Sequence, residues 1–195
     1  MAKKFIIGID EVGRGPLAGP MMVGAVAVSG NLDFLEGIKD SKKLSKKRRE
    51  EWSKKIWEEK ENGKNIKIAI VSVSHAAIDM FGISRSLKTA VAKCLEVLVE
   101  SDDEYEIMLD GSLYAPPKYK NQQTIIKGDE KIPIISAASV VAKVYRDNFM
   151  QKMHKKYPEY GFGAHKGYGT AAHTAAIKKY GLSEIHRRSF CRKLV

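Results

Sequence analysis

The hydrophobic pattern predicts a sheet built from short buried strands. Residues 5–10 and 21–28 are mostly apolar runs of strand length, separated by a loop rich in Gly and Pro at 11–20. Comparable runs predict three further strands, at 66–74, 105–110 and 123–126. No helical pattern occurs before residue 42, whereas the fourth strand follows helices.

The segments between and after the strands have helical periodicity. Trp52, Ile56 and Trp57 share one face of a charged helix predicted within 42–61. Ser74 and Ser84 are plausible N-caps of two helices, the second of which is expected to extend to about residue 100. The pattern therefore predicts an α/β fold, a mixed sheet flanked by helices, but it does not determine the order of the strands.

The C-terminal third is predicted to be helical. Pro133 suits the first turn of a helix that extends to about residue 157, and one face of that helix carries apolar side chains. These are Ile135, Ala138, Val141, Ala142, Tyr145 and Phe149. A shorter helix is predicted at 171–179, ending at Gly181.

The charge of the chain favours a polyanionic partner. With 195 residues it suits one domain, its net charge is +11, and its pI is about 9.5. Residues 39–60 contain ten Lys or Arg against five acids, and residues 143–195 contain twelve against three. A run of charge is commonly just a solvated helix face, and a basic soluble protein without a nucleic-acid partner is the plainer alternative.

No feature of the sequence indicates export or a membrane. The longest apolar run, at 17–28, is interrupted by Gly and Pro and is shorter than the roughly 20 residues of a spanning helix. Cys94 and Cys191 are far apart and have no metal-binding spacing, which suits a reducing compartment. We therefore expect a cytoplasmic protein.

Acidic side chains occur where predicted strands end. Asp10 and Glu11 lie where the first buried strand ends, and Asp110 ends the fourth. Asp before Gly is often a simple turn residue, which is the favoured interpretation of Asp110 alone. Together with Glu11 and the later Asp129, however, these acids favour a site for Mg²⁺ or Mn²⁺, and a pair of such ions is a common device for phosphodiester cleavage.

The loop from Gly13 to Ala18 matches a dinucleotide-binding pattern, but that interpretation is rejected. The pattern should open a helix, and here Pro16 and Pro20 lead into a predicted strand. A backbone rich in Gly can instead approach a nucleic-acid strand closely, with Arg14 near phosphate. The plainer alternative is a tight turn.

Two later loops combine cations with an aromatic residue. These are residues 165–169 (HKGYG) and 186–190 (HRRSF). This composition suits phosphate contact and stacking. None of the five His residues has a spacing that demands a metal, so a surface or internally satisfied role is expected for them.

Seven motifs, in order along nearly the whole chain, resemble the ribonuclease HII family, the type 2 ribonucleases H. They are GIDEVGRGPLAGP (8–20), DSKKLS (40–45), LDG (109–111), KGD (127–129), ISAASVVAKVYRD (135–147), HKGYGT (165–170) and HRRSF (186–190). The resemblance implies a single ribonuclease H-like domain over 1–195. It also implies a five-stranded mixed sheet and a C-terminal helical region from about residue 150.

The resemblance also implies the roles of individual residues. The four catalytic acids, which would hold the metal ions, are Asp10, Glu11, Asp110 and Asp129. Gly13, Arg14 and Gly15 would read the 2′-hydroxyl of a ribonucleotide, and Tyr168 would pack on the sugar of the next deoxynucleotide. Further basic positions of the motifs are substrate-binding candidates: Lys42, Lys43, Arg146, Arg187 and Arg188.

The implied activity is that of an endonuclease acting on the RNA strand of RNA–DNA hybrids. It would also cut duplex DNA 5′ of the RNA-to-DNA junction at embedded ribonucleotides, leaving 5′-phosphate and 3′-hydroxyl ends, in ribonucleotide removal and primer processing. We expect a monomer, and no sliding-clamp peptide is evident because the Gln and paired aromatics of such a peptide are missing. The alternatives are a non-catalytic hybrid- or duplex-binding protein and another two-metal nuclease, such as a junction resolvase.

Overall fold

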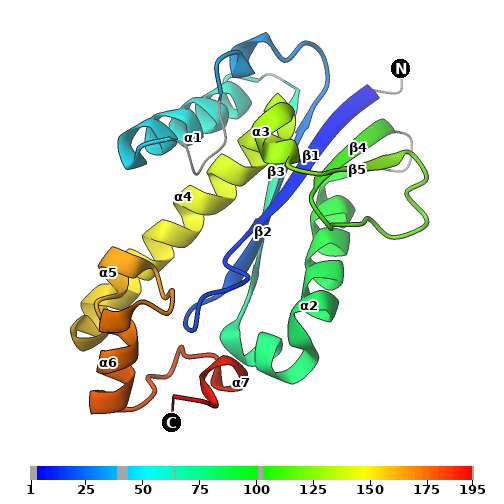
Figure 1. Ribbon diagram of the computed structural model, residues 1–195. Coiled ribbons are helices and arrows are strands. Elements are labelled where there is room, and N and C mark those ends of the chain that lie inside the picture. Colours follow the sequence, from blue (N-terminus) through cyan, green and yellow to red (C-terminus); the bar gives the residue numbers. More distant parts are fainter. Residues whose placement is uncertain (1–3, 39–43, 64, 101–102, 195) are drawn as a thin grey trace.

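The centre of the fold is a five-stranded mixed sheet with the strand order β3-β2-β1-β4-β5 (Figure 1). The computed structural model describes residues 4–38, 44–63, 65–100 and 103–194. The strands are β1 (Lys4–Val12), β2 (Met21–Val28), β3 (Ile66–Val73), β4 (Glu104–Asp110) and β5 (Gln122–Ile125). β1, β2 and β3 pair antiparallel, whereas β4 is parallel to both β1 and β5. The predicted five-stranded mixed sheet is confirmed.

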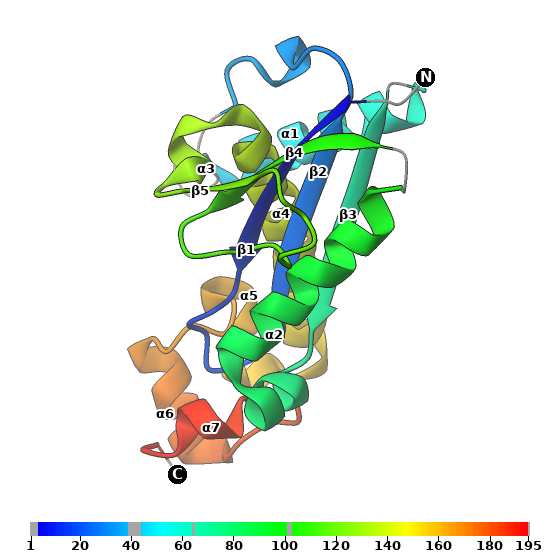
Figure 2. The same ribbon diagram turned by 90° about the vertical axis from the view of Figure 1, so that its right-hand side faces the viewer.

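Helices cover both faces of this sheet (Figures 1 and 2). The helix α2 (His75–Leu98) lies on one face, and α4 (Pro133–Lys156) lies on the other, with α1 (Lys46–Glu61) packed outside α4. Ile7 and Ile9 of β1 belong to the core under α2, while Ile134 and Ala138 of α4 belong to the second core, on the opposite face. The strand β1 is therefore buried on both sides, as its apolar run predicts.

Two glycines allow α4 to lie directly on the sheet. A Cβ atom on Gly8 would stand 2.2 Å from the Ile134 carbonyl oxygen, and one on Gly24 would stand 2.6 Å from that of Ala138. Since any larger residue would push the helix away, these glycines set the distance between α4 and the two central strands. The first turns of α4 are thereby held beside the end of β1.

The C-terminal region forms a third, smaller core beyond the end of the sheet. Both ribbon views place α5, α6 and α7 past the point where β1 ends (Figures 1 and 2). Met150 of α4 and Ala18 of the loop after β1 share this core with Phe162, Ile177 and Ile185. The elements after α4 are η2 (Pro158–Tyr160), α5 (Phe162–His165), α6 (Ala171–Tyr180) and α7 (Arg188–Cys191).

Three local predictions differ from the structure. β1 continues to Val12, so Glu11 lies within the strand and not in the loop after it. The break within α2 falls at Gly82, where φ is 73°, because glycine adopts this conformation without strain; Ser84 lies inside the helix. Tyr145, predicted on the buried face of α4, is exposed.

Other helix boundaries follow the sequence signals. Ser45 and Ser74 cap α1 and α2, each accepting a hydrogen bond from a backbone N–H three residues later. Pro133 stands in the first turn of α4, and Gly181 follows α6. Five short elements were not predicted individually: η1 (Asp33–Leu35), α3 (Gly128–Lys131), and the η2, α5 and α7 elements given above. Within the described ranges, no helix has the length and apolar character that crossing a membrane requires.

Candidate active site

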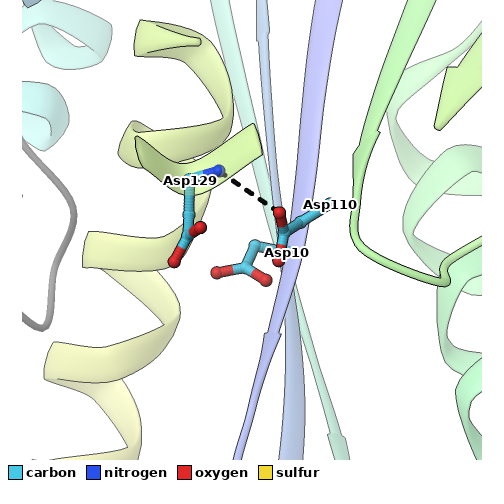
Figure 3. Close-up of side chains that lie close together, drawn as sticks. All are labelled: Asp10, Asp110 and Asp129. Atoms are coloured by element: carbon cyan, nitrogen blue, oxygen red, sulfur yellow. Dashed lines mark hydrogen bonds between the residues drawn. The ribbon is translucent and has the colours of Figure 1, made fainter. Parts of the chain in front are cut away.

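Three carboxylates meet at the edge of the sheet where β1 and β4 end (Figure 3). Each of Asp10, Asp110 and Asp129 offers an oxygen atom within 4.8 Å of those of the other two. Asp10 and Asp129 are only 4% and 3% exposed. The structure therefore brings together three of the four acids predicted from the sequence.

Each of the three side chains is placed by a different element. Asp10 lies on the α4 face of β1, since side chains alternate along a strand and Ile9 points into the opposite core. Asp110 ends β4, and its carboxylate accepts hydrogen bonds from the backbone N–H groups of Gly128, at 2.6 Å, and Asp129, at 3.3 Å. The short helix α3 thus fixes Asp110 and carries Asp129 (Figure 3).

Burial and mutual repulsion make the cluster costly without a cation. Burial raises the pKa of Asp10 well above its ordinary value, and the nearby charges of Glu11 and Asp110 raise it further. A hydrogen bond with Ser139 and one from the Glu11 backbone N–H, at 2.7 Å, oppose this rise. The ionised form therefore needs a compensating positive charge.

The donor set fits a hard divalent cation. Mg²⁺ and Mn²⁺ prefer carboxylate oxygens, and the three acids bring such oxygens within 4.8 Å of one another. A cation here would also offset the repulsion that raises the pKa of Asp10. The predicted metal site is therefore chemically consistent with the residues present.

Glu11, the fourth predicted acid, has a different environment. Its neighbour Asp10 points to the α4 side of β1, so the Glu11 side chain leaves the strand on the α2 side. It pairs with Arg14 at 3.2 Å, and Arg14 also lies 3.3 Å from the Ser112 hydroxyl. Burial raises the pKa of Glu11, against the opposing effect of Arg14. Its role as a metal ligand stays a prediction.

Hydrogen bonds from the Arg187 side chain hold the loop between β1 and β2 in place. This side chain is fully buried, and its three nitrogens donate to the carbonyl oxygens of Gly13 (2.6 Å), Arg14 (2.7 Å) and Gly19 (3.0 Å). Its backbone N–H also donates to Leu17, at 2.8 Å. Arg187 therefore determines the course of the loop that carries Gly13, Arg14 and Gly15.

Arg146 of α4 supports the same loop. It is fully buried and donates to the carbonyl oxygens of Pro20 at 2.9 Å and Ala18 at 3.3 Å. A Cβ atom on Gly13, whose φ is 88°, would stand 2.3 Å from the Arg146 Nε atom. In contrast, a Cβ atom on Gly15 would meet no atom within 4 Å, so the loop presents open space there.

The burial of these two arginines changes the interpretation of the basic motifs. Arg146 and Arg187 were expected to bind substrate, but their side chains face loop carbonyls and have no exposed surface. They act through the loop, whereas Arg188 is exposed. Lys42 and Lys43 lie outside the described residues, so their predicted roles stay predictions.

The segment carrying Tyr168 is joined to the same loop. The Gly167 carbonyl accepts hydrogen bonds from the backbone N–H groups of Leu17, at 2.8 Å, and Ala18, at 3.3 Å. A Cβ atom on Gly167, whose φ is 85°, would collide with the Ala18 carbonyl. Tyr168 itself is 43% exposed, which contradicts its alternative assignment to the core.

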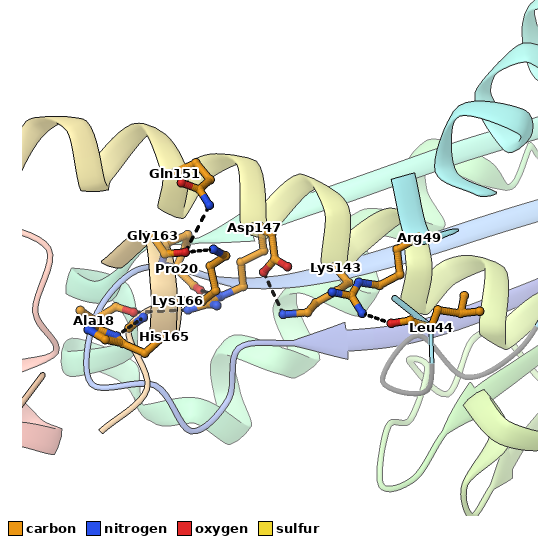
Figure 4. Close-up of polar contacts among 12 residues, drawn as sticks. Ala18, Pro20, Leu44, Arg49, Lys143, Asp147, Gln151, Gly163, His165 and Lys166 are labelled. Carbon is orange, nitrogen blue, oxygen red and sulfur yellow. Dashed lines mark hydrogen bonds and ion pairs between the residues drawn. The ribbon is translucent and has the colours of Figure 1, made fainter. Parts of the chain in front are cut away.

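Polar side chains of α4 form contacts within the helix and with α5 (Figure 4). Lys143 pairs with Asp147, one turn further along the same helix, at 2.8 Å. Gln151 and Lys166 both donate to the Gly163 carbonyl, which anchors α5 to the helix. The α4 helix therefore positions the acid cluster at one end and the Tyr168 segment at the other.

Two hydroxyl groups at the site were not singled out from the sequence. Ser139 bonds Asp10, and Ser136, one turn earlier on α4, donates to the Asp129 carbonyl at 2.7 Å. A signal was present, since polar residues three apart on an otherwise apolar helix face usually have partners. On the α2 side of the sheet, a separate cavity of about 400 Å³ is lined in part by Arg14, Lys88 and Tyr114.

Comparison with known proteins gives a consistent result across the whole chain. A family model described as ribonuclease HII matches residues 7–193. A ribonuclease HII of Coxiella burnetii is 44% identical over 186 residues, covering 95% of this chain and 88% of that protein.

Solved structures are similar over the same extent. The ribonuclease H2 of Pyrococcus horikoshii has a TM-score of 0.76 at 27% identity, covering 97% of this chain and 96% of that one. Bst-RNase HIII in complex with Mn²⁺ has a TM-score of 0.74 at 17% identity, covering 99% of this chain and 70% of that one. The second likeness concerns the fold alone.

Proposed function

The chain belongs to the ribonuclease HII family, and we propose that it cuts duplex DNA 5′ of the RNA-to-DNA junction at embedded ribonucleotides. Its fold is ribonuclease H-like, as predicted, and it is a ribonuclease H, an endonuclease of a family that acts on RNA–DNA hybrids. Its cellular role under this proposal is ribonucleotide removal and primer processing.

One observation carries this proposal: Asp10 of the acid cluster and the Gly13–Arg14–Gly15 loop lie on one continuous segment. Asp10 lies in β1, and the loop begins directly after Val12, where the strand ends. The loop is in turn hydrogen-bonded to the segment of Tyr168. A nucleic-acid strand bound along the loop would therefore have a phosphate near the carboxylates.

The acids have the roles of metal ligands in this proposal. Asp10, Asp110 and Asp129, with Glu11 as the fourth acid, would hold Mg²⁺ or Mn²⁺, two ions during turnover. When bound, the ions activate a water molecule and offset charge on the phosphate. The chain's own contribution is to orient the carboxylates, through the amides of Gly128 and Asp129 and through Ser139.

The two loops would supply the choice of substrate. Gly15 leaves open space for close approach of a sugar, and a 2′-hydroxyl is what distinguishes RNA from DNA. Tyr168 offers an exposed ring for the next sugar, where a second 2′-hydroxyl would crowd it. Together they would recognise a step from RNA to DNA.

The decisive experiment uses three duplexes: one with a single embedded ribonucleotide, one RNA–DNA hybrid and one of DNA only. Each is incubated with Mg²⁺, with Mn²⁺ or with chelator, and the cut position is mapped. We expect metal-dependent cleavage 5′ of the ribonucleotide with 5′-phosphate ends. Binding without any cleavage would identify a non-catalytic binder, and cutting of DNA only would identify a different two-metal nuclease.

Replacing Tyr168 should change substrate preference. We expect Tyr168→Ala to reduce cleavage at a single ribonucleotide about tenfold more than cleavage of a long hybrid, because contact of a ring with a nucleotide contributes about 1–3 kcal/mol. Tyr168→Phe, which keeps the ring, should behave like the unmodified protein. The measurement is kcat/KM on both substrates.

A matched control for this variant is Tyr180→Ala. Tyr180 is 51% exposed on α6 and is not part of the loops described above. Its replacement should leave the substrate preference unchanged. Equal losses on both substrates for Tyr168→Ala would contradict the assignment.

The basic surface predicts a steep dependence of binding on salt. Arg188 is exposed and follows the buried Arg187, so Arg188→Gln should lower the slope of log affinity against log salt by about one. Lys4→Gln is the control, since Lys4 lies at the opposite end of β1 from the acids. Binding to a catalytically inactive variant, measured by fluorescence anisotropy between low and high salt, tests both. An unchanged slope for Arg188→Gln would remove Arg188 from the binding surface.

A further inference from the structure

Three imidazole rings lie close together beside the Tyr168 segment, and each forms hydrogen bonds in a defined direction. His165 and His173 stack with ring centroids 4.4 Å apart, and the centroid of His186 lies 5.2 Å from that of His173. His173 and His186 are buried. The metal site does not use them.

The backbone determines which nitrogen of His186 carries the proton. The Ser183 backbone N–H donates to His186 Nδ1 at 2.8 Å, so Nδ1 is a bare acceptor. The proton of the neutral ring is therefore on Nε2. This atom lies 3.0 Å from Nε2 of His173, which must accept.

The proton position on His186 determines the proton position on His173, and therefore the hydrogen bond to Tyr168. Because His173 accepts at Nε2, its own proton is on Nδ1, and Nδ1 lies 2.9 Å from the Tyr168 carbonyl oxygen. The chain of donors thus passes from Ser183 through His186 and His173 to the backbone of Tyr168. His165 is ordered separately, accepting from the Gly167 N–H and donating to the Tyr160 carbonyl at 2.8 Å.

The environment keeps these rings neutral. Burial, together with the neighbouring His173, lowers the pKa of His186 to about 4. Burial likewise lowers the pKa values of His173 and His165. A second proton on His173 or His186 would point at another hydrogen-bond donor, so the neutral forms are the ones that satisfy the hydrogen bonds.

This chain of hydrogen bonds from Ser183 through His186 and His173 to Tyr168, called the relay below, connects the two loops that we propose recognise the RNA-to-DNA junction. At one end is the Tyr168 carbonyl. At the other is residue 183, in the segment whose Arg187 holds the loop of Gly13 and Arg14. The Tyr168 carbonyl keeps a second hydrogen bond from the Thr170 N–H, at 2.9 Å, so loss of the relay would displace the segment without unfolding it.

We propose that His173 and His186 are positioning residues for junction recognition: their proton-ordered relay holds the backbone of Tyr168 at a set place relative to the Gly13–Arg14–Gly15 loop. This inference rests on the proposed role of Tyr168. Its consequence is that substrate preference depends on a donor at the position of His173 Nδ1, and not on the bulk of the ring.

Two substitutions of His173 separate these roles. His173→Asn places an amide N–H near the former Nδ1 and keeps the donor to Tyr168. His173→Gln is larger and keeps only the acceptor for His186. We expect His173→Gln to lower the ratio of kcat/KM on a single embedded ribonucleotide to that on a long hybrid by about five- to tenfold. His173→Asn should keep the ratio within about twofold of the unmodified protein.

A role in packing alone predicts the opposite order, because the smaller Asn would leave the larger void. Equal ratios in the two variants would therefore overturn the inference. Thermal melting of both variants provides the control for folding. Tyr168→Ala, measured in parallel, separates the two proposals: if it leaves the ratio unchanged, the role of Tyr168 itself is wrong, and the inference that rests on it fails as well.

The relay can also be tested in the unmodified protein without substrate. NMR of ¹⁵N-labelled histidine distinguishes the two neutral tautomers at neutral pH. We expect His186 protonated at Nε2 and His173 protonated at Nδ1. Any other assignment would overturn the relay even if junction cleavage by the protein is confirmed.

Discussion

Asp10→Asn should abolish cleavage, with a loss of at least about 100-fold in kcat, while leaving the fold intact. The substitution preserves shape but removes one of three charges that lie within 4.8 Å of one another. Metal-ion catalysis contributes several kcal/mol, and each factor of ten corresponds to about 1.4 kcal/mol, so 100-fold is a conservative estimate. Cleavage of the single-ribonucleotide duplex with Mg²⁺ and with Mn²⁺ measures the loss.

The same variant should be more stable than the unmodified protein when both are free of metal. The folded-state pKa of Asp10 is raised by burial, so the ionised carboxylate opposes folding at neutral pH. The sign follows from linkage: this destabilisation grows as the pH rises above the ordinary carboxyl pKa of about 3.9, and it vanishes below that value. Thermal melting in chelator should show a higher midpoint for Asp10→Asn at neutral pH but not under strongly acidic conditions.

Asp33→Asn is the matched control, since Asp33 is an exposed acid away from the cluster. It should leave both activity and melting unchanged. Full activity of Asp10→Asn, or turnover by the unmodified protein in excess chelator, would contradict the assignment of the acid cluster as the metal site.

Arg187→Lys should lower the free energy of unfolding by about 3 kcal/mol and reduce cleavage strongly. The guanidinium donates to three loop carbonyls at 2.6–3.0 Å, and a single ammonium group cannot reach all three. Each buried carbonyl left without a donor costs about 1–3 kcal/mol. Burial also lowers the pKa of Arg187 to about 10, and a lysine in this place would lose its proton still more readily.

The adjacent position provides an internal comparison. Arg188 is exposed, and its backbone N–H, which any side chain retains, donates to Asp79 at 2.8 Å. Arg188→Lys should therefore change stability by less than about 0.5 kcal/mol. Urea unfolding of both variants, with activity measured in parallel, tests the contrast. Similar stabilities would show that the Arg187 hydrogen bonds contribute little to holding the loop.

The sequence alone determined the elements and the chemistry of the site. Apolar runs of strand length predicted the five strands, and Ser74, Pro133 and Gly181 predicted one boundary each of α2, α4 and α6. These signals are local, because capping and periodicity depend on residues a few positions apart. Asp10 and Asp110 could be chosen from their places at strand ends. Asp129 was indicated only by the resemblance to the family and as a further acid, because the short helix α3 that carries it gave no comparable signal.

The tertiary structure alone decided the roles of the basic and histidine residues. Arg146, Arg187 and Arg188 are all basic positions of the sequence motifs and look alike in the sequence. In the structure the first two point inward to loop carbonyls, and the third is exposed to solvent. His173 and His186 are thirteen positions apart and become partners only when α6 and the following turn pack together. The physical reason is that periodicity defines the faces within one element, whereas burial and hydrogen bonding depend on which faces meet across the whole chain.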